Sequence, residues 1–115
     1  MDVSVIVPTF NEGPNVRELL RRLDAALTGT AFEVVFVDDS TDSTPDIIRE
    51  AAAKTDTPVR LIHRDHPTGG LGGAVVEGIQ ASASDWCLVM DGDLQHPPEV
   101  IPDMLARAQR GDADV

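Results

Sequence analysis

Short apolar runs alternate along the chain with longer stretches in which apolar residues recur at helical spacing. The runs rich in valine, isoleucine and leucine predict strands at residues 3–8, 32–39, 59–64 and 86–91. A helix is predicted after each run. The helical period is clear over residues 16–27 and at Ile47, Ile48 and Ala51, and it is less sharp over 74–83 and 100–108. Because the strands are almost continuously apolar, we expect helices on both faces of a mostly parallel sheet, which is a three-layer α/β fold.

Polar and glycine-rich residues gather in the loops that follow the predicted strands. These loops read PTFNEG, DDSTDST, RDHPTGGLGG and DGDLQHPP, whereas the opposite loops, such as TGTA and SASD, are short and plain. Parallel strands end at one edge of a sheet, and open α/β sheets bind ligands at the carboxyl ends of their strands. The asymmetry therefore predicts one site at that edge.

The composition indicates a single domain and limits its partners. The 115 residues can bury one small core, and no apolar run approaches the roughly 18 residues that a membrane span needs. Twenty acids against nine bases give a net charge of −11, which argues against nucleic acid and against an anionic bilayer as partners of this segment. The opening MDVSVIVPTF reads as a strand and not as a signal peptide, so a cytoplasmic localisation is expected.

Two aspartates one residue apart end the fourth predicted strand. In extended backbone Asp91 and Asp93 point the same way, and Gly92 between them permits a sharp turn and the close approach of a ligand. Facing carboxylates repel each other unless a cation lies between them, and Mg²⁺ or Mn²⁺ suits such oxygen ligands. Gln95 can add an amide oxygen, and His96 is a weaker candidate. A plain Asp-Gly turn fits the motif alone about as well, but its position after a buried strand favours the metal site.

A second acidic pair, Asp38 and Asp39, ends the second predicted strand. Acids at strand ends accept hydrogen bonds from ribose hydroxyls in nucleotide-binding folds, and they can also accept them from a nucleobase edge. We expect Asp39 to face the ligand and Asp38 to support it. The residues that follow read as a turn and a helix cap.

The glycine-rich stretch GGLGG, residues 69–73, follows the third predicted strand. An NAD site is disfavoured, because Val75 stands where a third fingerprint glycine would fall and the stretch does not follow the first strand. A turn that brings backbone N–H groups to a phosphate and a turn without a ligand both remain open. Arg64 and His66 are either cations for a diphosphate or solvated loop residues. The spacing of the histidines lacks the pattern of a zinc site, so zinc is rejected.

The last residues, RGDADV, read as the end of a helix followed by the opening of a fifth strand. We therefore expect residues 1–115 to form one domain that is incomplete at its C-terminus and stops after the fourth strand–helix unit. An open sheet edge of this kind needs a longer parent chain, a homo-oligomer or a swapped edge strand to cover it.

Four motifs in order resemble glycosyltransferase family 2, which has the GT-A nucleotide-sugar fold: VSVIVPTFNE, VVFVDDSTDST, GGLGGAVVEGIQAS and LVMDGDLQHPPEVIPDML. Within that family they are most similar to the dolichyl- or polyprenyl-phosphate mannose synthases. The resemblance covers essentially the whole chain and implies a Rossmann-like α/β/α donor domain. It also implies an inverting transfer of a sugar from a nucleoside diphosphate, GDP-mannose being expected, to a polyprenyl or dolichyl phosphate at the cytoplasmic face of the membrane.

The resemblance also assigns a site. The residues implied to contact the nucleotide sugar are Pro8, Phe10, Glu12, Val37, Asp39, Asp91, Gly92 and Asp93. The implied ligands of Mg²⁺ or Mn²⁺ are Asp91, Asp93 and Gln95, and the two aspartates are the implied catalytic residues. Phe10 is often a tyrosine in the family and DGD is often DAD, and neither departure changes the argument for a metal.

Two other functions fit the same sequence. A non-catalytic nucleotide-binding or assembly module is the stronger alternative, because family members place acceptor-side residues further along the chain than Val115. For the same reason we expect the segment, as the donor half of a glycosyltransferase site, to bind nucleotide weakly with Mn²⁺ or Mg²⁺ and to turn over poorly alone. A Mg²⁺-dependent phosphohydrolase of the haloacid dehalogenase type also carries Asp-x-Asp after a strand, but on its first strand and without a glutamine at the position of Gln95.

Overall fold

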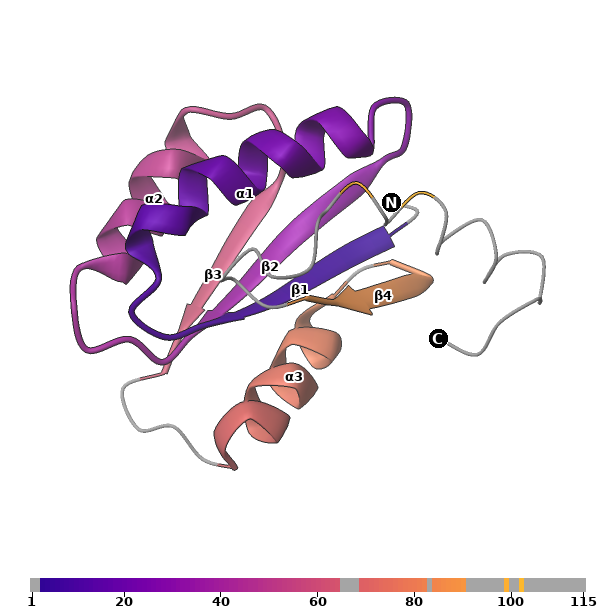
Figure 1. The fold of residues 1–115 in the computed structure, drawn as a ribbon. Coiled ribbons are helices and arrows are strands. Elements are labelled where there is room, and N and C mark those ends of the chain that lie inside the picture. The colour runs from indigo at the N-terminus through magenta and orange to yellow at the C-terminus, as the bar shows by residue number, and fades with distance from the viewer. Residues whose placement is uncertain (1–2, 65–68, 83, 91–98, 100–101, 103–115) are drawn as a thin grey trace.

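The computed structural model of the chain describes residues 3–64, 69–82, 84–90, 99 and 102. The elements in this part of the chain are β1 (Val3–Thr9), α1 (Gly13–Ala26), β2 (Phe32–Asp38), α2 (Thr44–Ala53), β3 (Val59–His63), α3 (Gly70–Ala81) and β4 (Trp86–Val89) (Figure 1). The predicted strands and the first three predicted helices are confirmed. The fourth predicted helix, over 100–108, lies outside the described residues except for residue 102.

The strands form one parallel sheet in the order β3-β2-β1-β4. β1 is an inner strand, where Val5 pairs with Val34 of β2 on one side and with Leu88 of β4 on the other. β1 is buried along its whole length, as expected for a strand with helices on both faces of its sheet. Because β2 and β3 extend the sheet to one side of β1 and β4 returns to the other, the strand order reverses between β1 and β4. A reversal of this kind is where open α/β sheets form their ligand crevice.

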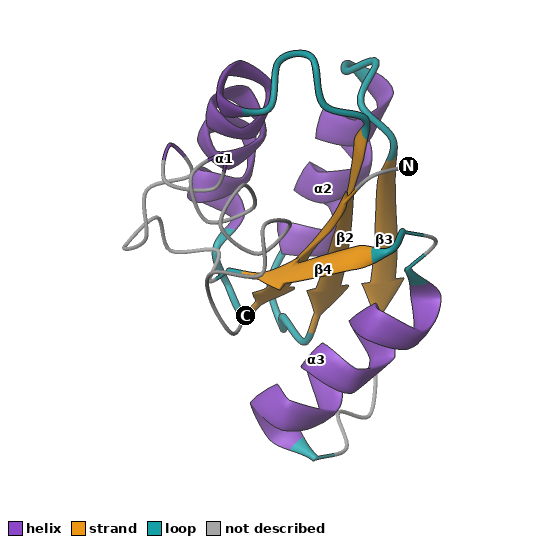
Figure 2. Ribbon diagram, turned by 90° about the vertical axis from the view of Figure 1, so that its right-hand side faces the viewer, coloured by secondary structure: helices purple, strands orange, loops and turns teal. Residues whose placement is uncertain are grey.

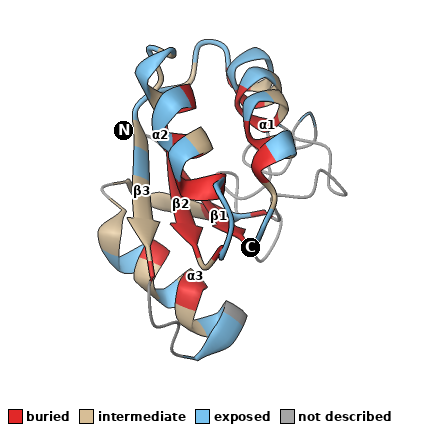
Figure 3. Ribbon diagram, turned by 90° about the vertical axis from the view of Figure 1, so that its left-hand side faces the viewer, coloured by how far each residue is buried: buried red, intermediate tan, exposed pale blue. Residues whose placement is uncertain are grey.

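Helices α1 and α2 cover one face of the sheet and α3 lies on the other face (Figures 1 and 2). Side chains alternate accordingly along β1: Val5 and Val7 belong to the larger core beneath α1 and α2, whereas Ile6 belongs to the smaller core beneath α3. Figure 3 shows the same division along α1 and α2, where buried positions face the sheet and exposed positions face outward. The predicted three-layer α/β architecture is confirmed.

The close seating of α3 on the sheet depends on Gly78. A Cβ atom at this position would lie 2.4 Å from Cγ2 of Ile6 and 3.2 Å from Cγ2 of Val37. At Gly72, on the same helix, an added Cβ would meet nothing within 4 Å. The glycine at residue 78 therefore lets the helix backbone approach β1 and β2.

The start of α3 differs from the prediction. The helix was expected from residue 74, but it begins at Gly70, so most of the glycine-rich stretch forms its first turn and not a loop before it. The chain enters the helix through Gly69 and Gly70, whose φ angles are +78° and +57°. Glycine adopts this left-handed region without steric cost, which explains the residue type at both positions. Among the described helices, none is both long and apolar enough to cross a membrane.

Candidate nucleotide site at the carboxyl edge of the sheet

Asp38, at the end of β2, is a fully buried carboxylate surrounded by hydrogen-bond donors. Its Oδ1 accepts from the hydroxyls of Thr9 and Ser40, both at 2.6 Å, and its Oδ2 accepts from the backbone N–H of Ser40 at 3.3 Å. Nδ1 of His63 lies 2.9 Å from Oδ2. These bonds offset the cost of burying the charge, and they join the ends of β1, β2 and β3 through one side chain. Its burial matches the supporting role expected for Asp38.

The loop after β1 is held to the loop after β2. Asn11 has a φ of +53°, a left-handed conformation that asparagine tolerates better than most residues. Its backbone N–H donates to the hydroxyl of Ser40 at 2.7 Å, and its side-chain Oδ1 accepts from the backbone N–H of Thr41 at 3.0 Å. The two loops predicted to line one site therefore form a single bonded unit.

Asp39 and Arg64 form a two-pronged ion pair at the same edge. Nε of Arg64 donates to Oδ1 of Asp39 and Nη2 donates to Oδ2, each at 2.7 Å. Nη2 also donates to the carbonyl of Gly70 at 3.0 Å, and Nη1 lies 3.9 Å from the carboxylate of Glu77. The hydrogen bonds that Arg64 donates to Asp39 raise the pKa of Arg64 further above its usual value, so the guanidinium stays charged despite its burial.

The structure excludes one of the two readings of Arg64. Its side chain is 6% exposed and paired, so it is not a solvated loop residue. The pairing follows from the register of the folded sheet: Asp38 pairs with His63 across β2 and β3, which brings the next residues, Asp39 and Arg64, side by side. Sequence reasoning missed this pair because the register of parallel strands is not visible in the chain itself.

The other residues predicted to contact the nucleotide divide into two groups. Phe10 is 58% exposed, and Glu12 precedes α1 with its Oε1 3.4 Å from the backbone N of Phe10, so both lie on the loop that Asn11 holds. The backbone N–H of Asp39 bonds to the carbonyl of Thr9 at 3.0 Å, which places Asp39 beside that loop. Phe10, Glu12 and Asp39 are thus brought to one edge.

Pro8 and Val37 lie within the sheet and not on its surface. The two residues pair across β1 and β2, and both are buried. The side chain of Val37 has no exposed surface and packs in the core beneath α3. The direct contact of these two residues with a nucleotide stays a prediction.

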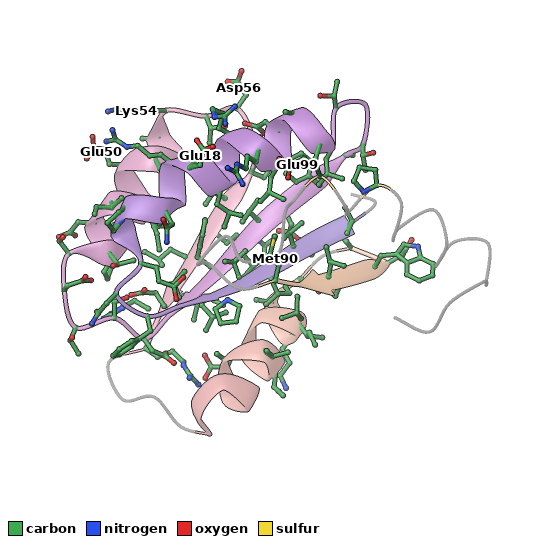
Figure 4. All side chains as sticks on the ribbon, in the orientation of Figure 1. Glu18, Glu50, Lys54, Asp56, Met90 and Glu99 are labelled. Carbon is green, nitrogen blue, oxygen red and sulfur yellow. The ribbon has the colours of Figure 1, made fainter. Side chains whose placement is uncertain are left out.

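The predicted metal ligands Asp91, Asp93 and Gln95, together with Gly92, lie outside the described residues. The chain leads into this motif from the same edge, because Met90 donates its backbone N–H to the carbonyl of Ile6 at 3.0 Å and its side chain lies in the core beneath α1 and α2 (Figure 4). Two carboxylates and an amide are donors that suit Mg²⁺ or Mn²⁺. Within the part of the chain that the structure describes, no group of three or more His, Cys, Asp or Glu residues is arranged to hold a metal.

A strand order that reverses beside β1, polar loops joined at one edge and an acid held by a buried arginine are features of a nucleotide-binding α/β protein. The model of the family described as glycosyl transferase family 2 matches residues 4–115. The chain belongs to this family. This membership argues against the phosphohydrolase alternative.

Known relatives and solved structures agree with the family. The chain is 46% identical over 112 residues to a dolichol-phosphate mannosyltransferase of Pyrococcus furiosus, covering 96% of this chain and 31% of that protein. It is 39% identical over 114 residues to an undecaprenyl-phosphate 4-deoxy-4-formamido-L-arabinose transferase of Pseudomonas aeruginosa, covering 95% and 33%. A mannosyltransferase from Pyrobaculum calidifontis, solved with GDP-Man and Mn²⁺, superposes with a TM-score of 0.76 at 31% identity, covering 97% and 32%. The predicted GT-A fold is confirmed, and the chain spans about a third of the length of these relatives.

Proposed function

We propose that the chain is the donor-binding part of an inverting, metal-dependent glycosyltransferase. In this proposal the donor is a nucleoside diphosphate sugar, GDP-mannose in the first place, and the acceptor is a polyprenyl or dolichyl phosphate. The observation that carries the proposal is the single edge that gathers Phe10, Glu12 and Asp39 and from which the chain leads into Asp91-Gly92-Asp93. The 46% identity to a dolichol-phosphate mannosyltransferase supports the choice of sugar and acceptor.

Each residue of the edge has a defined part in binding the donor. The carboxylate of Asp39 accepts hydrogen bonds from the ribose or the base, and exposed Phe10 lies along the nucleotide. Asp38 and Asn11 hold the two loops in place, so that the nucleotide meets a preorganised surface. Asp91, Asp93 and Gln95 would hold Mg²⁺ or Mn²⁺, which supplies positive charge for the diphosphate as the sugar leaves.

The reaction is a single displacement at the anomeric carbon. An oxygen of the acceptor phosphate forms the new C–O bond as the bond to the donor diphosphate breaks, and the electron pair leaves with the diphosphate. The acceptor oxygen attacks the face opposite the leaving group, which inverts the configuration. A phosphate acceptor is already anionic, so this step needs no general base from the chain. The lipid acceptor places the reaction at a membrane surface, on its cytoplasmic face.

Transfer of radioactive mannose from GDP-mannose to a polyprenyl phosphate, recovered in the organic phase, tests the proposal. We expect the product to depend on Mn²⁺ or Mg²⁺ and to be lost in Asp91→Asn. Asp85→Asn is the matched control, because Asp85 is an exposed acid at the opposite end of β4. Product at the full rate in Asp91→Asn or in excess EDTA would overturn the metal-dependent mechanism.

The same assay distinguishes the proposed transferase from a non-catalytic nucleotide-binding module. This alternative stays relevant because the chain covers only about a third of the relative's length. Binding of nucleotide without transfer from either a GDP-sugar or a UDP-sugar would favour a donor-binding module. Transfer from the UDP-sugar alone would correct the base while leaving the reaction class in place.

A further inference from the structure

Two arginines four residues apart fasten the two ends of α3 to β2. Arg60, within β3, has its Nε 3.0 Å from Oε1 of the buried Glu33 and donates from Nη1 to the carbonyl of Ala81, the last residue of α3, at 2.6 Å. Arg64, just after β3, bonds Asp39 and the carbonyl of Gly70, the first residue of α3. Each guanidinium thus joins an acid of β2 or its end to one terminus of the same helix.

We propose that Arg64 is a positioning residue for the nucleotide site. It holds the carboxylate of Asp39 in the orientation that receives the nucleoside, and it ties that carboxylate to the first turn of α3. The inference rests on the proposed function, because it assigns Arg64 a part in the binding of the nucleotide. Arg64 acts through Asp39 and not by contacting the ligand.

Burial distinguishes a positioning role from direct contact. The side chain of Arg64 is 6% exposed, whereas that of Asp39 is 18% exposed, so the carboxylate presents more of its surface to a ligand than the arginine behind it. The two-pronged pair takes one acceptor position on each oxygen of Asp39, and an ionised carboxylate has about four. Asp39 therefore keeps acceptor capacity for a ribose or a base while its plane is fixed by Arg64.

One nitrogen of Arg64 links Asp39 to the first turn of α3. Nη2 of Arg64 donates both to Oδ2 of Asp39, at 2.7 Å, and to the carbonyl of Gly70, at 3.0 Å. Gly70 and Gly69 have the positive φ angles that start the helix, and the next turn is closed by the bond from Gly73 N–H to the carbonyl of Gly69 at 3.1 Å. A ligand that fixes Asp39 therefore also favours this start of α3, and the coupling is reciprocal.

Arg60 provides the matched control. It has the same residue type and holds the same helix, and it lies within β3, which Arg64 directly follows. It pairs with Glu33 near the amino ends of the strands, however, and its side chain is 51% exposed. A role limited to fastening α3 would be common to both arginines. A role in positioning the nucleotide contact belongs to Arg64 alone.

The test compares Arg64→Lys and Arg60→Lys in calorimetric titrations with GDP and with UDP in the presence of Mn²⁺. Lysine keeps the positive charge but lacks the planar guanidinium that donates two hydrogen bonds to one carboxylate. Arg64→Lys should therefore weaken binding of the preferred nucleotide about tenfold, while the affinity of Arg60→Lys should stay within about twofold of wild type. The double variant Arg64→Lys/Asp39→Asn should bind no more weakly than Asp39→Asn alone, because Arg64 acts through Asp39.

Hydrogen exchange of α3 supplies a readout that fastening alone would not change. Saturating nucleotide with Mg²⁺ should slow exchange of the Gly73 amide in wild type and in Arg60→Lys, and this protection should disappear in Arg64→Lys. Unchanged affinity and retained protection in Arg64→Lys would overturn the positioning role. Additive losses in the double variant would also overturn it.

The outcomes separate this inference from the proposed function. Wild-type protein that binds neither GDP nor UDP would overturn both, whereas wild-type binding with an unaffected Arg64→Lys would overturn the role of Arg64 only. If Arg64→Lys does not fold, Asp39→Asn carries the test: its nucleotide-bound form should lose protection at Gly73, and retained protection would contradict the link.

Discussion

The amino edge and the carboxyl edge of the sheet contain similar groups of hydrogen-bonded side chains but serve different purposes. At the amino edge, buried Glu33 accepts from the hydroxyl of Ser4 at 2.6 Å and pairs with Arg60, and the hydroxyls of Ser4 and Ser84 lie 2.8 Å apart. At the carboxyl edge, buried Asp38 is enclosed in the same way, but Asp39 beside it is only partly covered by Arg64.

The difference between the edges lies in the loops and not in the buried acids. At the amino edge, hydroxyls of the loops such as those of Thr28 and Ser84 form hydrogen bonds within the structure. The loops at the carboxyl edge are bonded to each other through Asn11 and leave Phe10 58% exposed. A buried acid with an arginine partner is therefore no mark of a binding site by itself. Partly exposed groups on loops that are held rigid are the better mark.

Removing the buried acid of each edge should give the largest contrast. Asp38→Ala leaves the donors of Thr9 and Ser40 buried without their acceptor, so we expect a loss of about 3 kcal/mol in the free energy of unfolding together with weaker nucleotide binding. Glu33→Ala should cost about 1 to 2 kcal/mol, because half-exposed Arg60 can turn to water, and should leave nucleotide binding unchanged. Urea unfolding measures the loss of stability and calorimetric titration measures nucleotide affinity. An equal loss of nucleotide affinity in Asp38→Ala and Glu33→Ala would mean that the two edges do not differ in nucleotide binding.

A single methyl group added at residue 78 should disturb the packing of α3, the helix that runs from one edge of the sheet to the other. Gly78→Ala would drive a Cβ into Ile6 and Val37, and overpacking of this kind should cost about 1 to 3 kcal/mol. Gly72→Ala is the control on the same helix, where the space is open and alanine should stabilise by up to about 1 kcal/mol. Thermal unfolding separates them, and a Gly78→Ala variant as stable as Gly72→Ala would show that α3 is not seated as described.

Each edge also has a loop residue in left-handed conformation, Asn11 at the carboxyl edge and Gly29, with a φ of +87°, at the amino edge. Alanine at either position should cost about 1 kcal/mol of stability through backbone strain. Asn11→Ala should in addition weaken nucleotide binding, because the bonds to Thr41 are lost, whereas Gly29→Ala should not. Nucleotide titrations of the two variants at matched stability test this, and identical affinities would separate the Asn11 loop from the site.

The smallest effect is expected at Glu18 on α1, away from both edges (Figure 4). The hydrogen bonds from Arg21 and then from Arg22 lower the pKa of Glu18 from 4.5 to about 2. Because the folded pKa is the lower one, the stabilisation is present above pH 4.5 and is lost as the pH falls toward 2. The exposed position keeps it small. Urea unfolding of wild type and Glu18→Gln should differ slightly at pH 7 and converge by about pH 2, and a gap that widens toward low pH would contradict the sign.

The fold was predictable because its signals are local. The nearly continuous valine and isoleucine runs of β1 and β2 indicated buried parallel strands, and Leu19 and Leu23 indicated the inner face of α1. The start of α3 was missed because Gly69 to Gly73 carry no apolar period, and the helix begins there by backbone conformation.

The candidate site was predictable in position but not in its internal contacts. The loops after the strands identified the edge, since parallel strands end together. The pairing of Arg64 with Asp39 depends on the register of β2 against β3, and the burial of Val37 depends on which face α3 covers. Both are set by tertiary packing, which a single sequence does not display.

A nucleotide titration monitored by amide spectra of the ¹⁵N-labelled protein shows whether nucleotide binds at the carboxyl edge of the sheet. With GDP and Mg²⁺, we expect shifts at the amides of Asn11, Asp39 and Gly73 and none at Gly29 and Ser84, and we expect these shifts to weaken when EDTA removes the metal. Shifts centred on Gly29 and Ser84, or shifts at the carboxyl edge that are indifferent to EDTA, would contradict a metal-dependent nucleotide site at the carboxyl ends of the strands.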